Sequence, residues 1–179
     1  VAWFFDDVIR QSEFEHGGYR VNQISGVMVN TPQFLTDQHQ IVDEQSFLNY
    51  ISRLEAFERV IDEVKSRVLD DRDNGIVPPD FVIEKSLAGM RSFSDGVVEA
   101  NPLVATLSEK LKKLDGISTE RKAELTQQSL AVVENKIIPK YFEMIEVFEE
   151  LLVTSDHNAG IWRLPQGEDI YRAALRSNN

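Results

Sequence analysis

The chain has 179 residues, a mass of 20.4 kDa and no cysteine, and 42% of its residues are hydrophobic. A chain of this length and composition buries a substantial core on folding, which excludes a disordered segment and a disulfide-stapled scaffold. Its 30 acidic residues against 19 Lys and Arg give a net charge of −11; this field repels phosphate backbones, so we expect no nucleic-acid partner.

The sequence contains no membrane span, because its apolar runs fall far short of the ~20 residues that a span requires. No secretory signal pattern opens the chain. The absence of cysteine fits several compartments, so composition leaves the localisation open. Because residues 1–5 begin inside an apolar pattern and the last helical pattern stops at Asn179, we expect a fragment of a longer protein. Such ends also predict a homodimer of the fragment or mobile termini.

The first predicted element is a helix over residues 1–11, where apolar residues recur at spacings of three and four. Between residues 16 and 36 this periodicity disappears. Gly26 and Pro32 interrupt the stretch, which is typical of a long, ordered and well-packed loop.

The clearest helical pattern in the chain starts after Asp43. This residue has the position of an N-cap, and Val42 and Phe47 are placed as a hydrophobic staple around it. The pattern continues for more than twenty residues and ends at Asn74-Gly75, a left-handed C-cap signal. Its apolar positions are Phe47, Tyr50, Ile51, Leu54, Phe57, Val60, Ile61, Val64 and Val68.

Four further helices are predicted. The first covers about residues 80–93, and a short one follows Asn101-Pro102 and ends at Gly116. A long helix then starts at Ser118 or Thr119 and runs to about Thr154.

Pro139 should kink that long helix, because proline lacks an amide donor. After a turn-rich connector over residues 161–167, a last helix covers residues 169–176. These elements predict an all-α fold: one domain over residues 1–179, a single irregular bundle of about six helices.

The sequence carries no phosphate-binding loop, nucleophile elbow or His-Glu-x-x-His motif. Its three histidines, His16, His39 and His157, lie in separate segments without ligand spacing. His16, flanked by Glu13 and Glu15, could ligate a metal only if the fold supplied a further carboxylate, and a polar loop histidine is the favoured interpretation. We therefore assign no catalytic and no metal residue.

Two acidic clusters are better explained as solvated surface. Residues 70–75 resemble the start of a calcium loop, but Arg72 and Phe81 occupy the third and twelfth places, where oxygen ligands are required. Glu143, Glu146 and the pair at 149–150 lack the Glu-x-x-His partner of a di-metal site in a helical bundle.

Several short motifs, which follow one another in a fixed order along the chain, are similar to those of a known family. They are Arg20–Gly26 (RVNQISG), Pro32–Leu35 (PQFL), Tyr50–Leu54 (YISRL), Asn74–Pro79 (NGIVPP), Ile138–Tyr141 (IPKY), and Gly160–Glu168 (GIWRLPQGE) with Tyr171. This succession resembles the amino-terminal part of the bacterial "domain of unknown function 885" family over nearly the whole chain.

The resemblance implies a mostly helical parent protein of several hundred residues. Members are often exported, as periplasmic proteins or lipoproteins, and resemble zinc metallopeptidases. Their metal motif, a His-Glu followed by Pro-Gly-His-His, belongs to the carboxy-terminal half, so the resemblance implies zinc in the parent and no cofactor in this chain. It also implies the missing half of the same protein as a partner and a peptide as substrate.

Two irregular segments, residues 19–34 and 162–171, are rich in aromatic and amide side chains and are candidates for lining a substrate groove. The candidate residues are Tyr19, Asn22, Gln23, Trp162, Arg163 and Tyr171. For Trp162 and Tyr171 the alternative is that they plug the core beneath a turn.

Two functions remain open from the sequence. The first is the non-metal helical portion of a zinc metallopeptidase-like hydrolase that acts on peptides, inactive alone. The alternative is a helical protein-binding or envelope-associated module with no catalytic activity.

Overall fold

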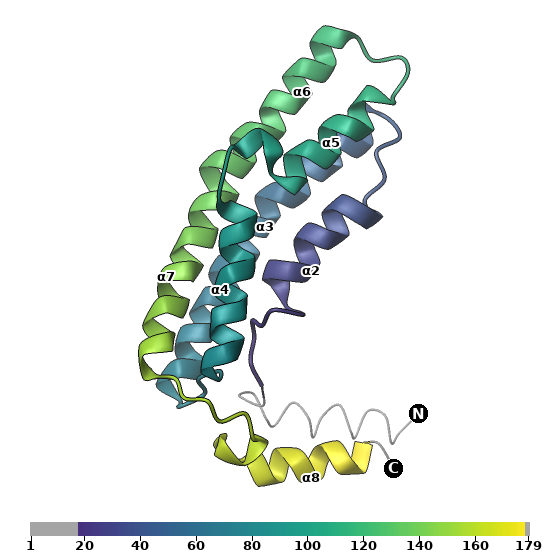
Figure 1. Cartoon of the computed structure of the whole chain (residues 1–179). Helices are drawn as coiled ribbons and strands as arrows, with labels where there is room; N and C mark the ends of the chain where they lie inside the picture. Colours follow the sequence, from purple (N-terminus) through teal and green to yellow (C-terminus); the bar gives the residue numbers. More distant parts are fainter. Residues whose placement is uncertain (1–17, 178–179) are drawn as a thin grey trace.

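The computed structural model describes residues 18–177, and over this range the chain is helical with no strand (Figure 1). The α-helices are α2 (Val27–Gln33), α3 (Glu44–Asp73), α4 (Asp80–Ser94), α5 (Pro102–Lys112), α6 (Thr119–Val132), α7 (Ile138–Thr154) and α8 (Gly167–Ser177). Two π-helical turns, η1 (Phe34–Gln38) and η3 (Val133–Ile137), and two 3₁₀ turns, η2 (Val98–Ala100) and η4 (Ile161–Arg163), complete the fold.

With α6, η3 and α7 taken as one continuous rod, the described chain has six helices, which confirms the predicted all-α bundle. Helices α3, α4 and α7 run side by side, α5 and α6 extend one end, and α8 lies across the other end (Figure 1). The predicted helix over residues 1–11 and His16 lie outside the described residues.

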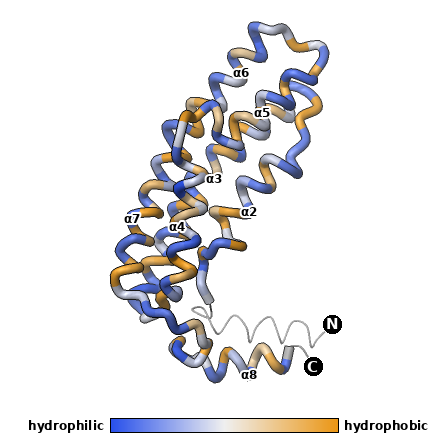
Figure 2. Tube along the Cα trace, in the orientation of Figure 1, coloured by the Kyte–Doolittle hydropathy of each residue, from blue (hydrophilic) through white to orange (hydrophobic). Residues whose placement is uncertain are grey.

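Amphipathic helices build the core of the bundle. Polar and apolar residues alternate along each helix in Figure 2, as burial of one face requires. The largest fully buried side chains are Tyr50, Tyr141, Phe47, Phe57, Phe148, Leu35, Leu54, Ile61, Ile83, Leu103, Leu107 and Leu111. They come from η1, α3, α4, α5 and α7, so one core runs along the bundle.

The start of α3 confirms the predicted N-cap. Asp43 Oδ1 accepts a hydrogen bond of 2.7 Å from the Ser46 amide, and Ser46 Oγ accepts one of 3.0 Å from the Asp43 amide. The predicted staple is wrong, because Val42 is 67% exposed while Phe47 is fully buried. The Ser46 hydroxyl also binds the Val42 amide at 2.9 Å and so fixes the path of the chain before the helix.

The other predicted helix ends are also present. Gly75 has a φ of +79° and donates its amide to the Arg72 carbonyl, which ends α3 in the left-handed conformation that glycine adopts without strain. Asn101 Oδ1 caps α5 by accepting from the Leu103 amide at 3.0 Å, and Ser118 Oγ caps α6 by accepting from the Arg121 amide at 3.2 Å.

The long loop predicted over residues 16–36 is wrong from residue 27 onward, because residues 27–38 form α2 and η1; before them the described chain is irregular over residues 18–26. The β-branched residues and the proline of α2 have low helix propensity, so the local sequence did not indicate a helix. Tertiary packing supplies the stability instead, because Met28, Pro32 and Leu35 are buried in the bundle.

Pro32 leaves one backbone carbonyl of α2 without its helical hydrogen bond, and a residue of α7 supplies the missing donor. Pro32 has no amide hydrogen to donate to the carbonyl of Met28, four residues earlier. The hydroxyl of Tyr141 in α7 donates to this carbonyl at 2.7 Å. Helix α2 is therefore completed by a side chain from α7.

The rod formed by α6, η3 and α7 is irregular next to Pro139, where the sequence predicts a kink. The π turn η3 ends directly before α7, in which Pro139 occupies the second position. A π turn places the chain one residue out of the α-helical hydrogen-bond register, and this irregularity lies where the proline cannot donate.

Candidate functional site

A hollow of about 290 Å³ opens between the irregular segment 18–26 and helices α2, α4 and α7. It is lined by Val21, Asn22, Gln23, Met28, Val29, Pro32, Ser86, Gly89, Met90, Phe93 and Tyr141. None of these side chains is charged, and most of them are apolar. This hollow is the candidate functional site.

Aromatic side chains make one wall of the hollow rigid. The rings of Phe93 and Tyr141 stack with centroids 4.2 Å apart, and Phe57 meets Tyr141 edge-on at 6.4 Å. Burial raises the pKa of Tyr141, so its hydroxyl stays protonated and continues to donate to Met28. The wall is therefore fixed both by stacking and by a hydrogen bond.

Asn22 forms the turn that presents Gln23 to the hollow. Its Oδ1 accepts from the amides of Ile24 and Ser25, each at 2.8 Å, and its Nδ2 donates to Ser25 Oγ at 3.0 Å. This Asx turn uses the Asn22 oxygen within the turn itself. Asn22 is therefore a positioning residue rather than a free polar group.

Gln23 carries the unexplained polar atom of the site. Its Oε1 is buried and accepts no hydrogen bond from the part of the chain that the structure describes. A buried acceptor without a partner costs about 1–3 kcal/mol, so such atoms are rare in native proteins.

The remaining polar side chain and the glycine of the hollow have different roles. Ser86 Oγ donates to the Val82 carbonyl at 2.7 Å within α4, so it is already paired. Gly89 leaves open space, because a Cβ built on it would meet nothing within 4 Å. The site therefore offers apolar walls and a free volume beside α4.

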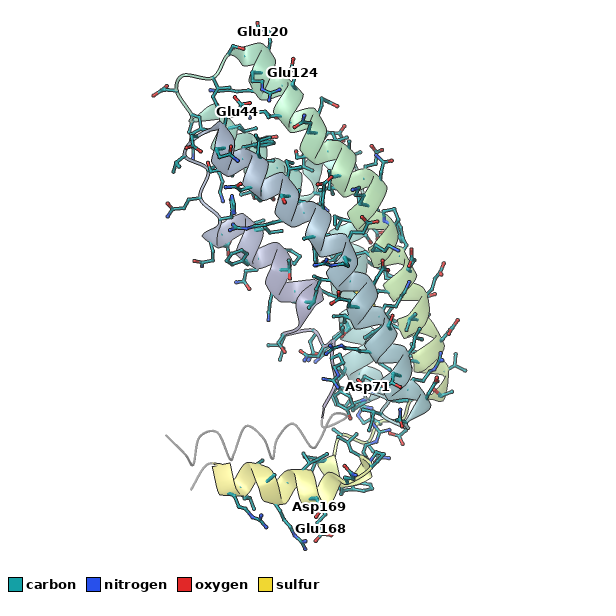
Figure 3. All side chains as sticks on the ribbon, turned by 180° about the vertical axis from the view of Figure 1, so that it is seen from behind. Glu44, Asp71, Glu120, Glu124, Glu168 and Asp169 are labelled. Atoms are coloured by element: carbon teal, nitrogen blue, oxygen red, sulfur yellow. The ribbon has the colours of Figure 1, made fainter. Side chains whose placement is uncertain are left out.

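The segment before the hollow is anchored to the end of α3. Arg20 Nε lies 3.1 Å from Asp71 Oδ2, and the Asp71 residue is only 4% exposed. Figure 3 shows Asp71 near one end of α3, beside the irregular segment. Because a buried carboxylate needs a cation or donors, this pair fixes the path of the chain toward Asn22.

The structure separates the six residues predicted to line one groove. Asn22 and Gln23 line the hollow, whereas Tyr19 lines a smaller depression beside Val68 and Asp71. Trp162, Arg163 and Tyr171 belong to η4 and α8 and do not line the hollow; their role in substrate binding stays a prediction.

The connector residues have distinct environments. Trp162 is 73% and Tyr171 52% exposed, so neither plugs the core. Arg163 is a structural residue: its guanidinium donates to the Val77 carbonyl at 2.9 Å and lies 3.2 Å from Asp156 Oδ1. It ties η4 to the segment between α3 and α4.

Sequence reasoning missed most of the walls of the hollow. Met28, Met90, Phe93 and Tyr141 read as ordinary core positions, and only their placement around a free volume distinguishes them. Gly89 gave the one available signal, because an isolated glycine inside a helical pattern suggests a packing or functional reason.

The histidines described by the structure lie apart from the hollow. His39 is buried, its Nε2 donates to the Ser46 carbonyl at 3.0 Å, and its Nδ1 accepts from Arg53. Burial lowers the pKa of His39, and the positive charges of Arg53 and Lys110 lower it further. His157 pairs with Asp80 at 2.8 Å.

Several acidic residues form surface ion pairs. Figure 3 shows Glu44, Glu120 and Glu124 near the same end of the bundle, where Arg121 binds Glu44 at 2.6 Å and Glu124 at 2.8 Å. Among residues 18–177 no group of three or more His, Asp or Glu is placed to hold a metal ion. No helix described here is long and apolar enough to cross a membrane.

A solved structure shares this fold. The crystal structure of the "putative lipoprotein" from Colwellia psychrerythraea superimposes with a TM-score of 0.85 and 28% sequence identity. The match covers 89% of this chain and 27% of that chain, so this chain spans about a quarter of the length of that protein.

A search of curated proteins found no significant match. A family model matches residues 5–179, almost the whole chain. The chain therefore belongs to the family described as "Bacterial protein of unknown function (DUF885)".

Proposed function

We propose that this chain is the non-metal helical portion of a longer, exported hydrolase of the zinc-metallopeptidase type, and that it binds peptide substrate but is inactive alone. The observation that carries the proposal is the mostly apolar hollow of about 290 Å³. Apolar walls with a few placed polar groups are typical of binding sites. The greater length of the similar lipoprotein, of which the match covers 27%, supports a larger parent.

The residues that the structure describes do not fit a zinc site. The described part of the chain offers no cluster of three or more ligand side chains. The proposal therefore places the metal in another part of the longer protein and assigns this chain the tasks of binding, orienting and desolvating a peptide. The apolar walls of the hollow would hold a side chain of the peptide.

The test compares the 179-residue chain with the natural gene product purified from its source cells. For each we would measure intact mass, zinc by atomic emission, and cleavage of a library of fluorogenic peptides. The expected result is a natural product well above 20.4 kDa that contains zinc, cleaves peptides and fractionates with the cell envelope or periplasm. The shorter chain should have neither zinc nor activity.

Several results would overturn this proposal. One tightly bound zinc ion per 179-residue chain would contradict the assignment of the metal to another part of the protein. Peptide cleavage by that chain would contradict its inactivity alone. A natural product of about 20.4 kDa, or a longer product without zinc or cleavage, would favour the alternative function.

That alternative is a helical protein-binding or envelope-associated module with no catalytic activity. The exposure of Trp162 and Tyr171 supports it, because large aromatic side chains at a surface are common anchors of protein interfaces. In a pull-down from source cells, Trp162→Ala with Tyr171→Ala should then abolish capture of a partner, whereas Gln23→Leu should not.

A further inference from the structure

We propose that Asn74, at the end of α3, is a modification site where the side-chain amide is converted to a carboxyl group without an enzyme, at a rate that the fold controls. Asn74 is followed by Gly75, and this is the only Asn-Gly pair in the sequence. Both residues are exposed. The group modified is therefore the Asn74 amide, and its co-reactant is water. The inference does not depend on the proposed function.

The reaction is a cyclisation followed by hydrolysis. The backbone nitrogen of Gly75 attacks Cγ of Asn74 and forms a C–N bond, while the bond from Cγ to Nδ2 breaks. Ammonia leaves with the proton of the Gly75 amide, and a succinimide ring remains. Water then opens this ring at either of its carbonyls and gives aspartate or isoaspartate. No oxidant or reductant is needed, and glycine permits the attack most readily because it has no Cβ beside the nitrogen.

In the folded structure the end of α3 holds the two reacting groups apart. Asn74 Nδ2 donates to the Asp70 carbonyl at 2.8 Å, and the Gly75 amide donates to the Arg72 carbonyl at 2.9 Å. Asn74 has a ψ of 10°, and cyclisation requires its backbone to rotate until the Gly75 nitrogen faces Cγ. The reaction therefore requires both hydrogen bonds to break.

Ile76 holds this turn closed. Its amide donates to the Asp71 carbonyl at 2.8 Å, and together with the bond from Gly75 this forms a Schellman motif. The Ile76 residue is only 2% exposed, and it lines the same small depression as Val68 and Phe148. Opening the turn therefore breaks a further hydrogen bond and disturbs a buried apolar side chain, which makes the open state rare.

The population of the open turn sets the rate of modification. Helix ends open locally without global unfolding. Cyclisation is far slower than the closing of a turn, so the observed rate is the rate in the open chain multiplied by the fraction of molecules that are open. The folded chain should therefore lose the Asn74 amide, but much more slowly than the unfolded chain.

The modification weakens the turn that slows it. A carboxylate at position 74 adds negative charge to the end of α3, where Asp70 and Asp73 already lie and where the helix dipole is negative. Isoaspartate also lengthens the main chain, so the hydrogen bonds of the Schellman motif lose their register. Modified molecules should therefore have a more open α3 end, beside the Arg20–Asp71 pair that anchors residues 18–26.

The test follows the Asn74 amide by peptide mass spectrometry while the 179-residue chain is incubated in neutral buffer, folded or in guanidinium chloride. Fragmentation that separates isoaspartate from aspartate identifies the product. We expect loss in both conditions, at least about tenfold slower in the folded chain, which is 1.4 kcal/mol. Asn158 is exposed and is followed by Ala159. It should keep its amide for longer, because the methyl group of Ala159 hinders the attack.

Two isoleucine variants locate the opening. Ile76→Ala removes the buried side chain of the turn, leaves the Asn-Gly pair intact, and should speed the loss in the folded chain at least about threefold. Ile83→Ala is the matched control, because Ile83 is fully buried in α4; it should leave the rate unchanged. In denaturant all three chains should react at one rate. If Ile76→Ala does not fold, Ile76→Val provides a smaller change in the same direction.

Four results would overturn the inference: an Asn74 amide that stays intact in the folded chain, equal rates in the folded and unfolded chains, earlier loss at Asn158, or equal acceleration by Ile76→Ala and Ile83→Ala. Anion exchange separates the modified chain by its additional charge. The amides of Gly75 and Ile76 should then exchange hydrogen faster than in the unmodified chain, and unchanged exchange would contradict the weakened turn.

Discussion

Pro32 in α2 and Tyr141 in α7 are complementary. Pro32 has no amide hydrogen to donate to the Met28 carbonyl, and the Tyr141 hydroxyl donates to this carbonyl instead, at 2.7 Å. The two residues lie far apart in the sequence, and each would be unfavourable without the other. A buried carbonyl without a donor is costly, and so is a buried phenol without an acceptor.

This relationship predicts a measurable coupling. Tyr141→Phe leaves the Met28 carbonyl without its donor and should lower the free energy of unfolding by about 1–3 kcal/mol. In a Pro32→Ala background the new amide at position 32 can donate to that carbonyl, so the same Tyr141→Phe change should cost less than half as much. Urea denaturation of all four proteins, followed by circular dichroism, gives the cycle. Equal costs in both backgrounds would contradict the complementarity.

Gly26, which precedes α2, should tolerate no side chain. Its φ is +105° and its ψ 173°, a region that is essentially restricted to glycine, and a Cβ would lie 2.7 Å from the Arg20 carbonyl oxygen. Gly26→Ala should therefore destabilise by about 1–3 kcal/mol. The matched control Gly89→Ala, at an open position within α4, should stabilise by up to about 1 kcal/mol. Thermal unfolding of both variants checks these opposite signs, and a stabilising Gly26→Ala would refute the assignment.

His39 should make stability depend on pH below neutrality. Burial lowers the pKa of His39 in the folded state, and Arg53 and Lys110 face it as cations, whereas in the unfolded chain it titrates near 6.5. Just below pH 6.5 the His39 side chain therefore binds a proton more readily in the unfolded chain than in the folded one. Its contribution to stability is complete above about pH 6.5 and is lost as the pH falls below that value.

Urea denaturation at pH 7.5 and 5.5 measures this loss. We expect the free energy of unfolding to fall at the lower pH in the unaltered chain and to fall less in His39→Gln. Carboxylates with a lowered pKa, such as Glu143 beside Lys65 and Lys140, act at still lower pH and do not overlap with this window. An equal loss in both proteins would show that His39 is not the group responsible.

Two glycines around η4 should differ in their tolerance of alanine. A Cβ at Gly167 would lie 1.9 Å from the backbone oxygen of Ile161, which cannot move without opening the turn before α8. A Cβ at Gly160 would also lie at 1.9 Å, but from Nε1 of Trp162, an exposed side chain that can rotate away.

Gly167→Ala should therefore speed amide hydrogen exchange throughout α8, and Gly160→Ala should leave it unchanged. In a Trp3→Phe background Trp162 becomes the sole tryptophan, and Gly160→Ala should then change its fluorescence. Protected α8 amides in Gly167→Ala would contradict the close approach to Ile161.

The elements that the sequence predicted well are those determined by local chemistry. The helix after Asp43 has its cap, its apolar period and its Asn74-Gly75 terminus within one stretch of chain, so no distant residue is needed to define it. The start of α6 at Ser118 was recognisable for the same reason.

The elements that could not be predicted depend on partners far along the chain. Helix α2 combines poor helix formers with a proline, and its missing hydrogen bond comes from Tyr141. The hollow has the same origin, because segments from residue 21 to residue 141 contribute to it. Asn22 and Gln23 were singled out for their amide groups. Only the three-dimensional structure shows that the Asn22 side chain forms a turn, whereas the Gln23 oxygen has no hydrogen-bond partner among the described residues.

The π turn within the long rod has a consequence for how its sequence can change. Buried positions recur every four residues, at Leu125, Ser129, Val133, Ile137 and Tyr141. In a regular α-helix each such step would drift by about 40° around the axis, and the slower winding of η3 compensates for this drift. Deleting one residue from 133–137 would return the turn to a regular α-helix and leave α6 and α7 on their present faces. Deleting one residue from α6 or α7 would instead rotate one part of the rod by about 100° relative to the other. The π turn is therefore the place in the rod where the chain can lose a residue while Phe148 keeps its place in the core.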